Sequence, residues 1–130
     1  MLLDKAGRPF FITEGDLSFL DPLLHMYFCF TPRPNIQGLP PKDQKSCETW
    51  AAGLLSKGIN IIALRPDNTV IGHVSLLPSL DLRDAEYMIF VHQGHRLLGI
   101  GTQLTLQAID KARSLGIKRL WLCVSSTNIP

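Results

Sequence analysis

The chain has 130 residues, of which 45% are hydrophobic, and 13 lysine and arginine residues against 11 acidic residues give it a net charge of +2. This size and hydrophobic content predict one globular domain, residues 1–130, with a core of its own. The near balance of charge argues against a nucleic-acid partner, and no uncharged stretch approaches the ~18 residues of a membrane span.

The N-terminal half predicts one strand and two helices. Residues 8–13 form an apolar run typical of a strand, and a helix follows that begins at Asp16 or at Asp21. Residues 31–42 hold four of the nine prolines and predict a loop. A second helix is expected from the N-cap Asp43 to a C-terminal glycine, with a buried stripe at Cys47, Trp50, Ala51, Leu54 and Leu55, ending at Gly58.

The C-terminal half predicts three strands, a helix and a further strand. Residues 59–64 and 70–77 read as a hairpin, and residues 84–91 read as a central strand because apolar residues occupy both of its faces. A nearly continuous apolar run at residues 119–124 predicts a buried strand, and as part of a βαβ unit it should run parallel to residues 84–91. The helix between them shows helical spacing at Leu104, Ala108, Ile109, Ala112 and Leu115, and ends at Gly116.

A glycine loop precedes that last helix and predicts an anion site. Gly99 and Gly101 lack the Cβ atoms that would keep a phosphate away from the backbone, and Arg96 adds a permanently charged donor. The first turn of a helix offers free N–H groups and the positive end of the helix dipole. The loop therefore indicates a cofactor that carries phosphate.

Two common phosphate-binding motifs do not fit this loop. A Walker P-loop requires a lysine before its serine or threonine, and here Thr102 directly follows Gly101. A Rossmann fingerprint requires a third glycine and a shorter distance from the preceding strand. The pattern that remains is RxxGxG, beginning at Arg96 several residues after a strand.

This pattern resembles the acetyl-CoA loop of the GNAT superfamily of N-acetyltransferases. Residues 70–76 (VIGHVSL) resemble the family's third strand, residues 99–104 (GIGTQL) its loop-to-helix junction, and residues 120–124 (LWLCV) its fifth strand. The resemblance covers nearly the whole chain. It implies an α/β fold of α+β layered type, in which helices flank a mixed twisted sheet of about five strands.

The resemblance also implies which residues meet acetyl-CoA, the co-substrate. The loop backbone would bind the pyrophosphate, and the strand end at Val91 would hydrogen-bond the pantetheine arm and polarise the thioester carbonyl. The residues expected to bind the co-substrate are Val91, Arg96, Leu97, Leu98, Gly99, Ile100, Gly101, Thr102 and Asn128.

Glu86 is the candidate catalytic base for direct attack by an amine in a ternary complex. Strand alternation places Glu86, Met88 and Phe90 on one face, and some members of the family carry a glutamate near this point. The structural alternative is an ordinary carboxylate paired with Arg83 or a lysine. The four histidines show no metal-ligand spacing, so no metal site is expected.

The resemblance fails at the C-terminus. The sequence ends at Pro130, before the helix that carries the tyrosine acid in typical members. This departure leaves open a CoA-binding module or truncated, inactive domain with a regulatory or assembly role, and an apolar edge at residues 119–124 suggests a homodimer. An unrelated α/β nucleotide binder that prefers ATP or NAD is a further alternative.

The remaining expectations concern partners and location. The acceptor is expected to be a small-molecule or peptide amine, with no membrane partner. Cys29, Cys47 and Cys123 are odd in number and widely spaced, which favours thiols of a cytoplasmic protein over a disulfide framework.

Overall fold

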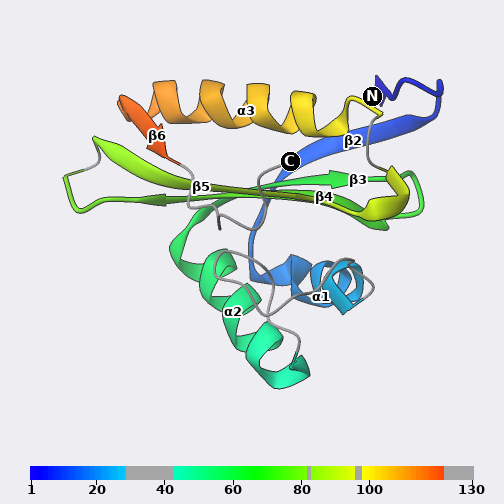
Figure 1. The fold of residues 1–130 in the computed structure, drawn as a ribbon, viewed down its shortest axis with the longest axis horizontal. Helices are drawn as coiled ribbons and strands as arrows, with labels where there is room; N and C mark the ends of the chain where they lie inside the picture. Colours follow the sequence, from blue (N-terminus) through cyan, green and yellow to red (C-terminus); the bar gives the residue numbers. More distant parts are fainter. Residues whose placement is uncertain (29–42, 82, 96–97, 122–130) are drawn as a thin grey trace, which may run out of the picture.

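A mixed sheet separates two helices on one face from a single helix on the other (Figure 1). The computed structural model describes residues 1–28, 43–81, 83–95 and 98–121. Over these residues six strands lie side by side in chain order, antiparallel except that the last runs parallel to its neighbour. They are β1 (Leu2–Leu3), β2 (Pro9–Gly15), β3 (Ile59–Leu64), β4 (Val70–Pro78), β5 (Asp84–Val91) and β6 (Arg119–Trp121).

The helices begin and end at residues suited to capping. The described helices are η1 (Leu17–Phe19), α1 (Leu20–Phe28), α2 (Gln44–Lys57), η2 (Gln93–His95) and α3 (Ile100–Ser114). The Asp16 and Asp43 carboxylates each accept a backbone N–H two or three residues ahead at 2.9 Å, which stabilises the start of η1 and of α2. Gly116 has a φ of +80° just beyond α3, where glycine costs least.

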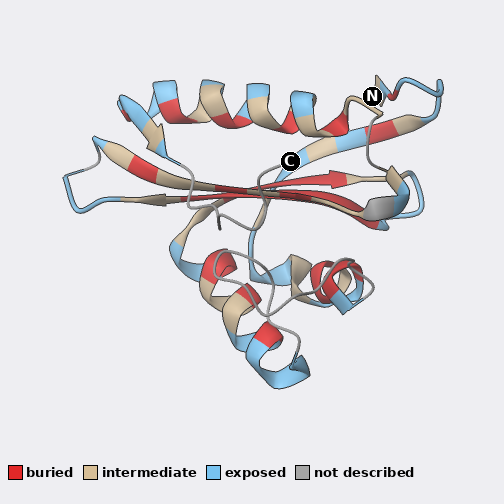
Figure 2. Ribbon diagram, in the orientation of Figure 1, coloured by how far each residue is buried: buried red, intermediate tan, exposed pale blue. Residues whose placement is uncertain are grey.

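The sheet carries a core on each face, and the buried sides of the helices face it (Figure 2). One core lies beneath α1 and α2 and takes Met88 and Phe90 from β5; the other lies beneath α3. Gly72 in β4 lets α3 approach closely, because a Cβ at this position would lie 2.7 Å from Leu104 Cδ1. The helix face that contacts the sheet at this point is Leu104, Ala108 and Ala112.

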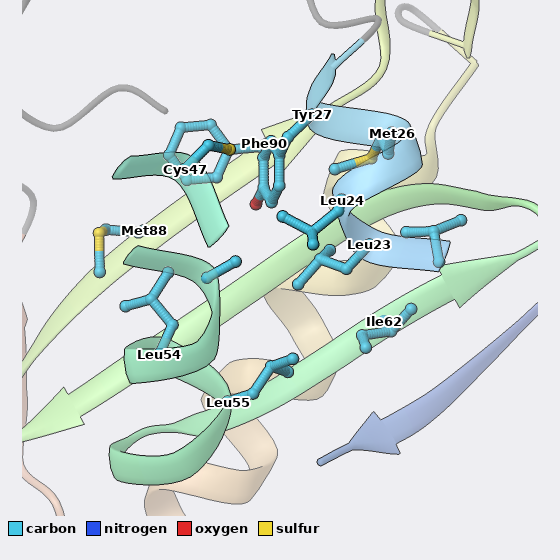
Figure 3. Close-up of a cluster of buried hydrophobic side chains, with 12 residues drawn as sticks. Leu23, Leu24, Met26, Tyr27, Cys47, Leu54, Leu55, Ile62, Met88 and Phe90 are labelled. Carbon is cyan, nitrogen blue, oxygen red and sulfur yellow. The ribbon is translucent and has the colours of Figure 1, made fainter. Parts of the chain in front are cut away.

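A buried hydrogen-bonded chain crosses the core beneath α1 and α2. Figure 3 shows Tyr27 of α1 beside Phe90 and Cys47. The Tyr27 hydroxyl lies 2.6 Å from His73 Nδ1, and His73 Nε2 lies 2.8 Å from Asn60 Oδ1. His73 and Tyr27 are both fully buried, so these contacts take the place of the hydrogen bonds to solvent that the two side chains would otherwise form.

The hydrogen bonds that join Asn60, His73 and Tyr27 have defined donors and acceptors. Asn60 Nδ2 donates to the carbonyls of Leu54 at 2.8 Å and Gly58 at 3.1 Å, so Asn60 Oδ1 is an acceptor. His73 therefore donates from Nε2 and accepts the Tyr27 proton at Nδ1, which requires a neutral ring. Burial lowers the pKa of His73 to about 3 and raises the pKa of Tyr27 well above its usual value.

Most of the predicted elements are confirmed, with differences at the two edges of the sheet. The hairpin, the strand at residues 84–91 and both caps of α2 lie where the sequence predicts them. The sheet has six described strands instead of about five, because the two-residue β1 is too short to leave a pattern. The strand over residues 119–121 is parallel to β5 as predicted, but it is not buried, since Trp121 is 52% exposed. Leu115 is also exposed, as the C-cap of α3.

Three other predictions lie outside the described residues or concern membranes. The proline-rich loop at residues 31–42 and residues 122–124 of the last predicted strand are not described. None of the helices in the described part of the chain combines the length and apolar character needed to cross a membrane.

Candidate functional site

The end of β5 and the start of α3 meet at one end of the sheet (Figure 1). His92 extends the ladder by donating its backbone N–H to the Ile71 carbonyl at 2.9 Å, and the His95 N–H then bonds back to the His92 carbonyl at 2.8 Å. This short turn redirects the chain from the strand toward α3. Leu98, Gly99, Ile100, Gly101 and Thr102 form the described part of the predicted loop, whereas Arg96, Leu97 and Asn128 lie outside the described residues.

Gly99 forms the N-cap of α3 in the left-handed region, with φ of +85° and ψ of 0°. Among the described residues no side chain caps this end of the helix, and the first turn holds no acidic residue. The N–H groups of the first turn have no acceptor within the helix, because the first bond closes from the Gln103 N–H to the Gly99 carbonyl. Uncapped N–H groups and the positive end of a 15-residue helix make this position suitable for an anion.

Gly101 lies in a different environment from Gly99. A Cβ on Gly101 would lie 3.6 Å from Val91 Cγ2 and 3.8 Å from Ile89 Cδ1, so its bare side faces β5. These are ordinary van der Waals distances, so the contact between the first turn of α3 and the strand end does not itself require glycine at this position. Ile100 is 1% exposed and anchors the same turn in the core beneath α3, which leaves its backbone and not its side chain for a ligand.

Residues 4–8, between β1 and β2, form a turn that we call the N-terminal turn. This turn contacts the glycine loop, a contact that the sequence pattern did not predict. The Lys5 backbone N–H donates to the Leu98 carbonyl at 2.9 Å. The aliphatic part of the Lys5 side chain lies over Gly99, with Lys5 Cε 3.5 Å from the position of a Cβ there. A pocket of about 310 Å³ opens between the two segments and is lined by Leu3, Asp4, Lys5, Leu98, Gly99, Thr102 and Gln103.

Glu86 lies on the face of β5 that carries Met88 and Phe90, as predicted from alternation. Its side chain is half-buried, on the sheet face covered by α1 and α2. Within the described residues Glu86 forms no ion pair, so the alternative of a simple pair with Arg83 is not what the structure shows. Residue 121 of β6 pairs directly with Glu86.

The backbone of β5 presents alternate residues to its two neighbours. His92 bonds to Ile71 and the register pairs Phe90 with His73, so the even-numbered residues form the hydrogen-bonded pairs with β4. The backbone groups of Tyr87, Ile89 and Val91 consequently point toward the β6 side. The described part of β6 pairs with β5 from Asp84 to Glu86.

Comparison with known proteins agrees with this geometry. Residues 22–130 match the sequence profile described as the acetyltransferase (GNAT) family. The chain belongs to the GNAT acetyltransferase family. No curated protein matches it in sequence.

Solved structures show the same GNAT fold at low sequence identity. The GNAT domain of S. lividans PAT matches with a TM-score of 0.83 and 14% identity over 98% of this chain and 78% of that one. The ribosomal-protein-S18-alanine N-acetyltransferase of Escherichia coli matches with a TM-score of 0.71 and 20% identity over 92% and 70% of the two chains. A spermidine N-acetyltransferase chimera from Vibrio cholerae and hSSAT matches at 0.63 and 17%, over 92% and 73%.

The described titratable groups of this GNAT chain do not gather into a metal centre. Among the described residues no group of three or more histidine, cysteine, aspartate or glutamate side chains could hold a metal ion. The rings of His92 and His95 lie next to each other near the loop, with centroids 5.7 Å apart and planes tilted by 58°. His73 is fully buried and hydrogen-bonded at both ring nitrogens.

Proposed function

We propose that this chain transfers an acetyl group from acetyl-CoA to an amine, by direct attack in a ternary complex. The observation that carries the proposal is the uncapped first turn of α3 behind Gly99, placed beside the end of β5. Membership of the GNAT family supports the reaction class. In this proposal the backbone from Leu98 to Thr102 binds the pyrophosphate together with Arg96 and Leu97, and Asn128 contacts the co-substrate elsewhere.

The length of β5 favours a ligand whose phosphate lies far from its reactive group. Val91 lies five residue steps after Glu86, which corresponds to about 17 Å along a strand. A pyrophosphate at the loop and an amine near Glu86 therefore need a long, narrow linker between them. The pantetheine arm of CoA supplies such a linker, whereas ATP has none.

Because of this distance, Val91 cannot have both of the roles expected from the sequence, which are to bind the pantetheine arm and to polarise the thioester carbonyl. A thioester polarised by the Val91 backbone would be too far from Glu86 for proton transfer, even through one water. We therefore place the pantetheine at Val91, and the thioester carbonyl at the backbone N–H of Ile89 or Tyr87, which point to the same side. Glu86, through water, takes the amine proton; the amine attacks the carbonyl carbon, and CoA leaves as the thiolate.

Calorimetric titration with acetyl-CoA tests the proposal, with ATP and NAD as controls. Saturable binding of acetyl-CoA and weaker binding of both nucleotides is the expected result, because only CoA reaches from the loop along β5. Equal or tighter binding of ATP or NAD would identify an α/β nucleotide binder instead.

Replacing Gly99 by asparagine is expected to weaken acetyl-CoA binding about tenfold. Asparagine tolerates the left-handed conformation, so the fold is retained, but its side chain competes with phosphate for the N–H groups of the first turn. Gly116→Asn is the matched control, since Gly116 has nearly the same φ at the other end of α3. Calorimetry on both variants should show weaker binding in Gly99→Asn alone; equal affinities would contradict the loop assignment.

A CoA-binding module without turnover is the second candidate function. The sequence contains two tyrosines, and neither is placed as a proton donor to a leaving thiolate. Tyr27 is buried against His73, and the Tyr87 hydroxyl lies 2.6 Å from Thr105 Oγ1 beneath α3. Release of free CoA thiol in the presence of polyamines and peptide amines would favour the enzyme, and binding without release would favour the module.

The acceptor remains a prediction of a small-molecule or peptide amine. The related structures are named for a ribosomal-protein alanine and for spermidine, which are different chemical classes. A cytoplasmic location and a homodimer through residues 119–124 also stay predictions, and most of that segment lies outside the described residues.

A further inference from the structure

Arg65, just after β3, forms hydrogen bonds that converge on the N-terminal turn and the glycine loop. Its Nη2 atom lies 2.8 Å from Asp4 Oδ2 and 2.9 Å from His95 Nδ1, and its Nη1 donates to the Pro9 carbonyl at 3.1 Å. The side chain of Arg65 is 11% exposed and that of Asp4 is fully buried. Three N–H donors of this guanidinium are thus bonded to protein groups, on a side chain that lies mostly away from solvent.

Asp4 passes this restraint to the N-terminal turn. Its second oxygen accepts the backbone N–H groups of Ala6 at 2.8 Å and Arg8 at 2.9 Å, which closes the turn around the carboxylate. Burial acts to raise the pKa of Asp4, but the hydrogen bonds from Arg8 and Arg65 outweigh it and hold the pKa below its usual value. The turn is therefore built on a charged carboxylate at neutral pH.

The restrained turn holds the glycine loop from one side, and Arg65 holds it directly from the other. Lys5, inside the turn, donates to the Leu98 carbonyl immediately before the N-cap Gly99. Arg65 contacts His95, which lies on the strand side of the loop. In Figure 1 the N-terminus, the β3–β4 turn and the start of α3 lie at the same end of the molecule.

The contact with Arg65 also fixes the protonation of His95. A guanidinium has only donors, so His95 Nδ1 must accept and its single proton must be on Nε2. Burial lowers the pKa of His95, and the charge of Arg65 lowers it further. The ring is consequently neutral where the loop is assembled.

We propose that Arg65 and Asp4 are positioning residues of the acetyl-CoA site, which together fix the position of the glycine loop relative to the end of β5. Neither side chain contacts the co-substrate in this arrangement. Arg65 fixes His95, Asp4 fixes the turn, and the turn fixes Leu98, so the first-turn N–H groups of α3 are aligned before the ligand arrives. The ligand in this inference rests on the proposed function, whereas the restraint on the loop does not.

Arg65→Met tests the proposal in two independent measurements. Hydrogen exchange of the Lys5 amide and of residues 98–104 should become at least about tenfold faster, because the turn loses its anchor. The Kd and KM for acetyl-CoA should rise about tenfold with kcat at saturation unchanged, since the reacting end of the site is untouched. Arg65→Lys should recover only part of both effects, because an ammonium cannot reach all three acceptors.

Arg119→Met is the matched control. It also removes an arginine bonded to an aspartate, Arg119 Nε lying 2.9 Å from Asp84 Oδ1, but at the opposite end of β5. Its loop exchange and acetyl-CoA affinity should match the wild type. Hydrogen exchange of the loop that is unchanged in Arg65→Met would overturn the positioning role. If the wild type binds acetyl-CoA, a Kd in Arg65→Met equal to that of the wild type would overturn it as well. A wild type that binds no acetyl-CoA would instead refute the proposed function, and the exchange data would still decide whether Arg65 holds the loop.

Discussion

Acidification from pH 6.5 to pH 3 is expected to lower the free energy of unfolding by on the order of 4 kcal/mol through His73 alone. In the folded state this ring is neutral down to a pKa of about 3, while in the unfolded chain it takes up a proton near its ordinary value of 6.5. The unfolded state therefore binds more protons between these two values. The stabilisation is fully present above pH 6.5 and is lost as the pH falls toward 3, by up to about 1.4 kcal/mol per pH unit.

Urea unfolding between pH 5 and 6.5 measures this slope before the carboxylates titrate. His73→Gln can donate to Asn60 and accept from Tyr27 without taking up a proton, so its slope in this range should be clearly flatter. His25→Gln, at an exposed position of α1, should keep the wild-type slope. Equal slopes for the wild type and His73→Gln would show that the buried ring is not the group that titrates.

Replacing Glu86 by glutamine is expected to lower kcat about a hundredfold or more, within the range for the loss of a general base. The amide keeps the size of the side chain and its place on the α1 and α2 face of β5, but it cannot accept the amine proton. The Kd for acetyl-CoA should not change, because the pyrophosphate would bind about 17 Å away along the strand. Steady-state kinetics with an acceptor found among the polyamines and peptide amines measures kcat, and calorimetry measures the Kd for acetyl-CoA separately.

Glu48→Gln provides the control for this variant. Glu48 is an exposed glutamate of α2, so its loss removes the same charge from the same side of the sheet. Its kcat should equal that of the wild type. A Glu86→Gln protein with unchanged kcat would make Glu86 an ordinary strand carboxylate and leave the proton to the solvent or to the acceptor.

Local patterns predicted the elements that local interactions build. The N-cap at Asp43 involves a bond three residues away, and the alternation of Glu86, Met88 and Phe90 follows from strand geometry alone. Even the parallel pairing of residues 119–121 with β5 follows from the connecting helix. Burial of that strand could not be read in the same way, because it depends on which neighbours cover the apolar side chains.

The glycine loop shows the limit of a motif. Gly99 and Gly101 are equivalent in the RxxGxG pattern, but Gly99 supplies a left-handed N-cap, whereas Gly101 faces β5 at ordinary van der Waals distance. The contacts that hold the loop are also invisible in a linear pattern. Arg65 and Asp4 are 61 positions apart, and neither residue belongs to a recognisable motif.

The spatial order of the strands equals their order in the chain, which has a consequence for biosynthesis. As the polypeptide leaves the ribosome, each new strand can add to the free edge of the sheet beside the strand made just before it. Among the described strands none has to insert between two that are already paired, and of the steps between them only that from β5 to β6 requires a crossover helix to be laid down first. The nascent sheet can thus grow in a single direction, with β5 and the start of the glycine loop emerging onto strands that are already in place.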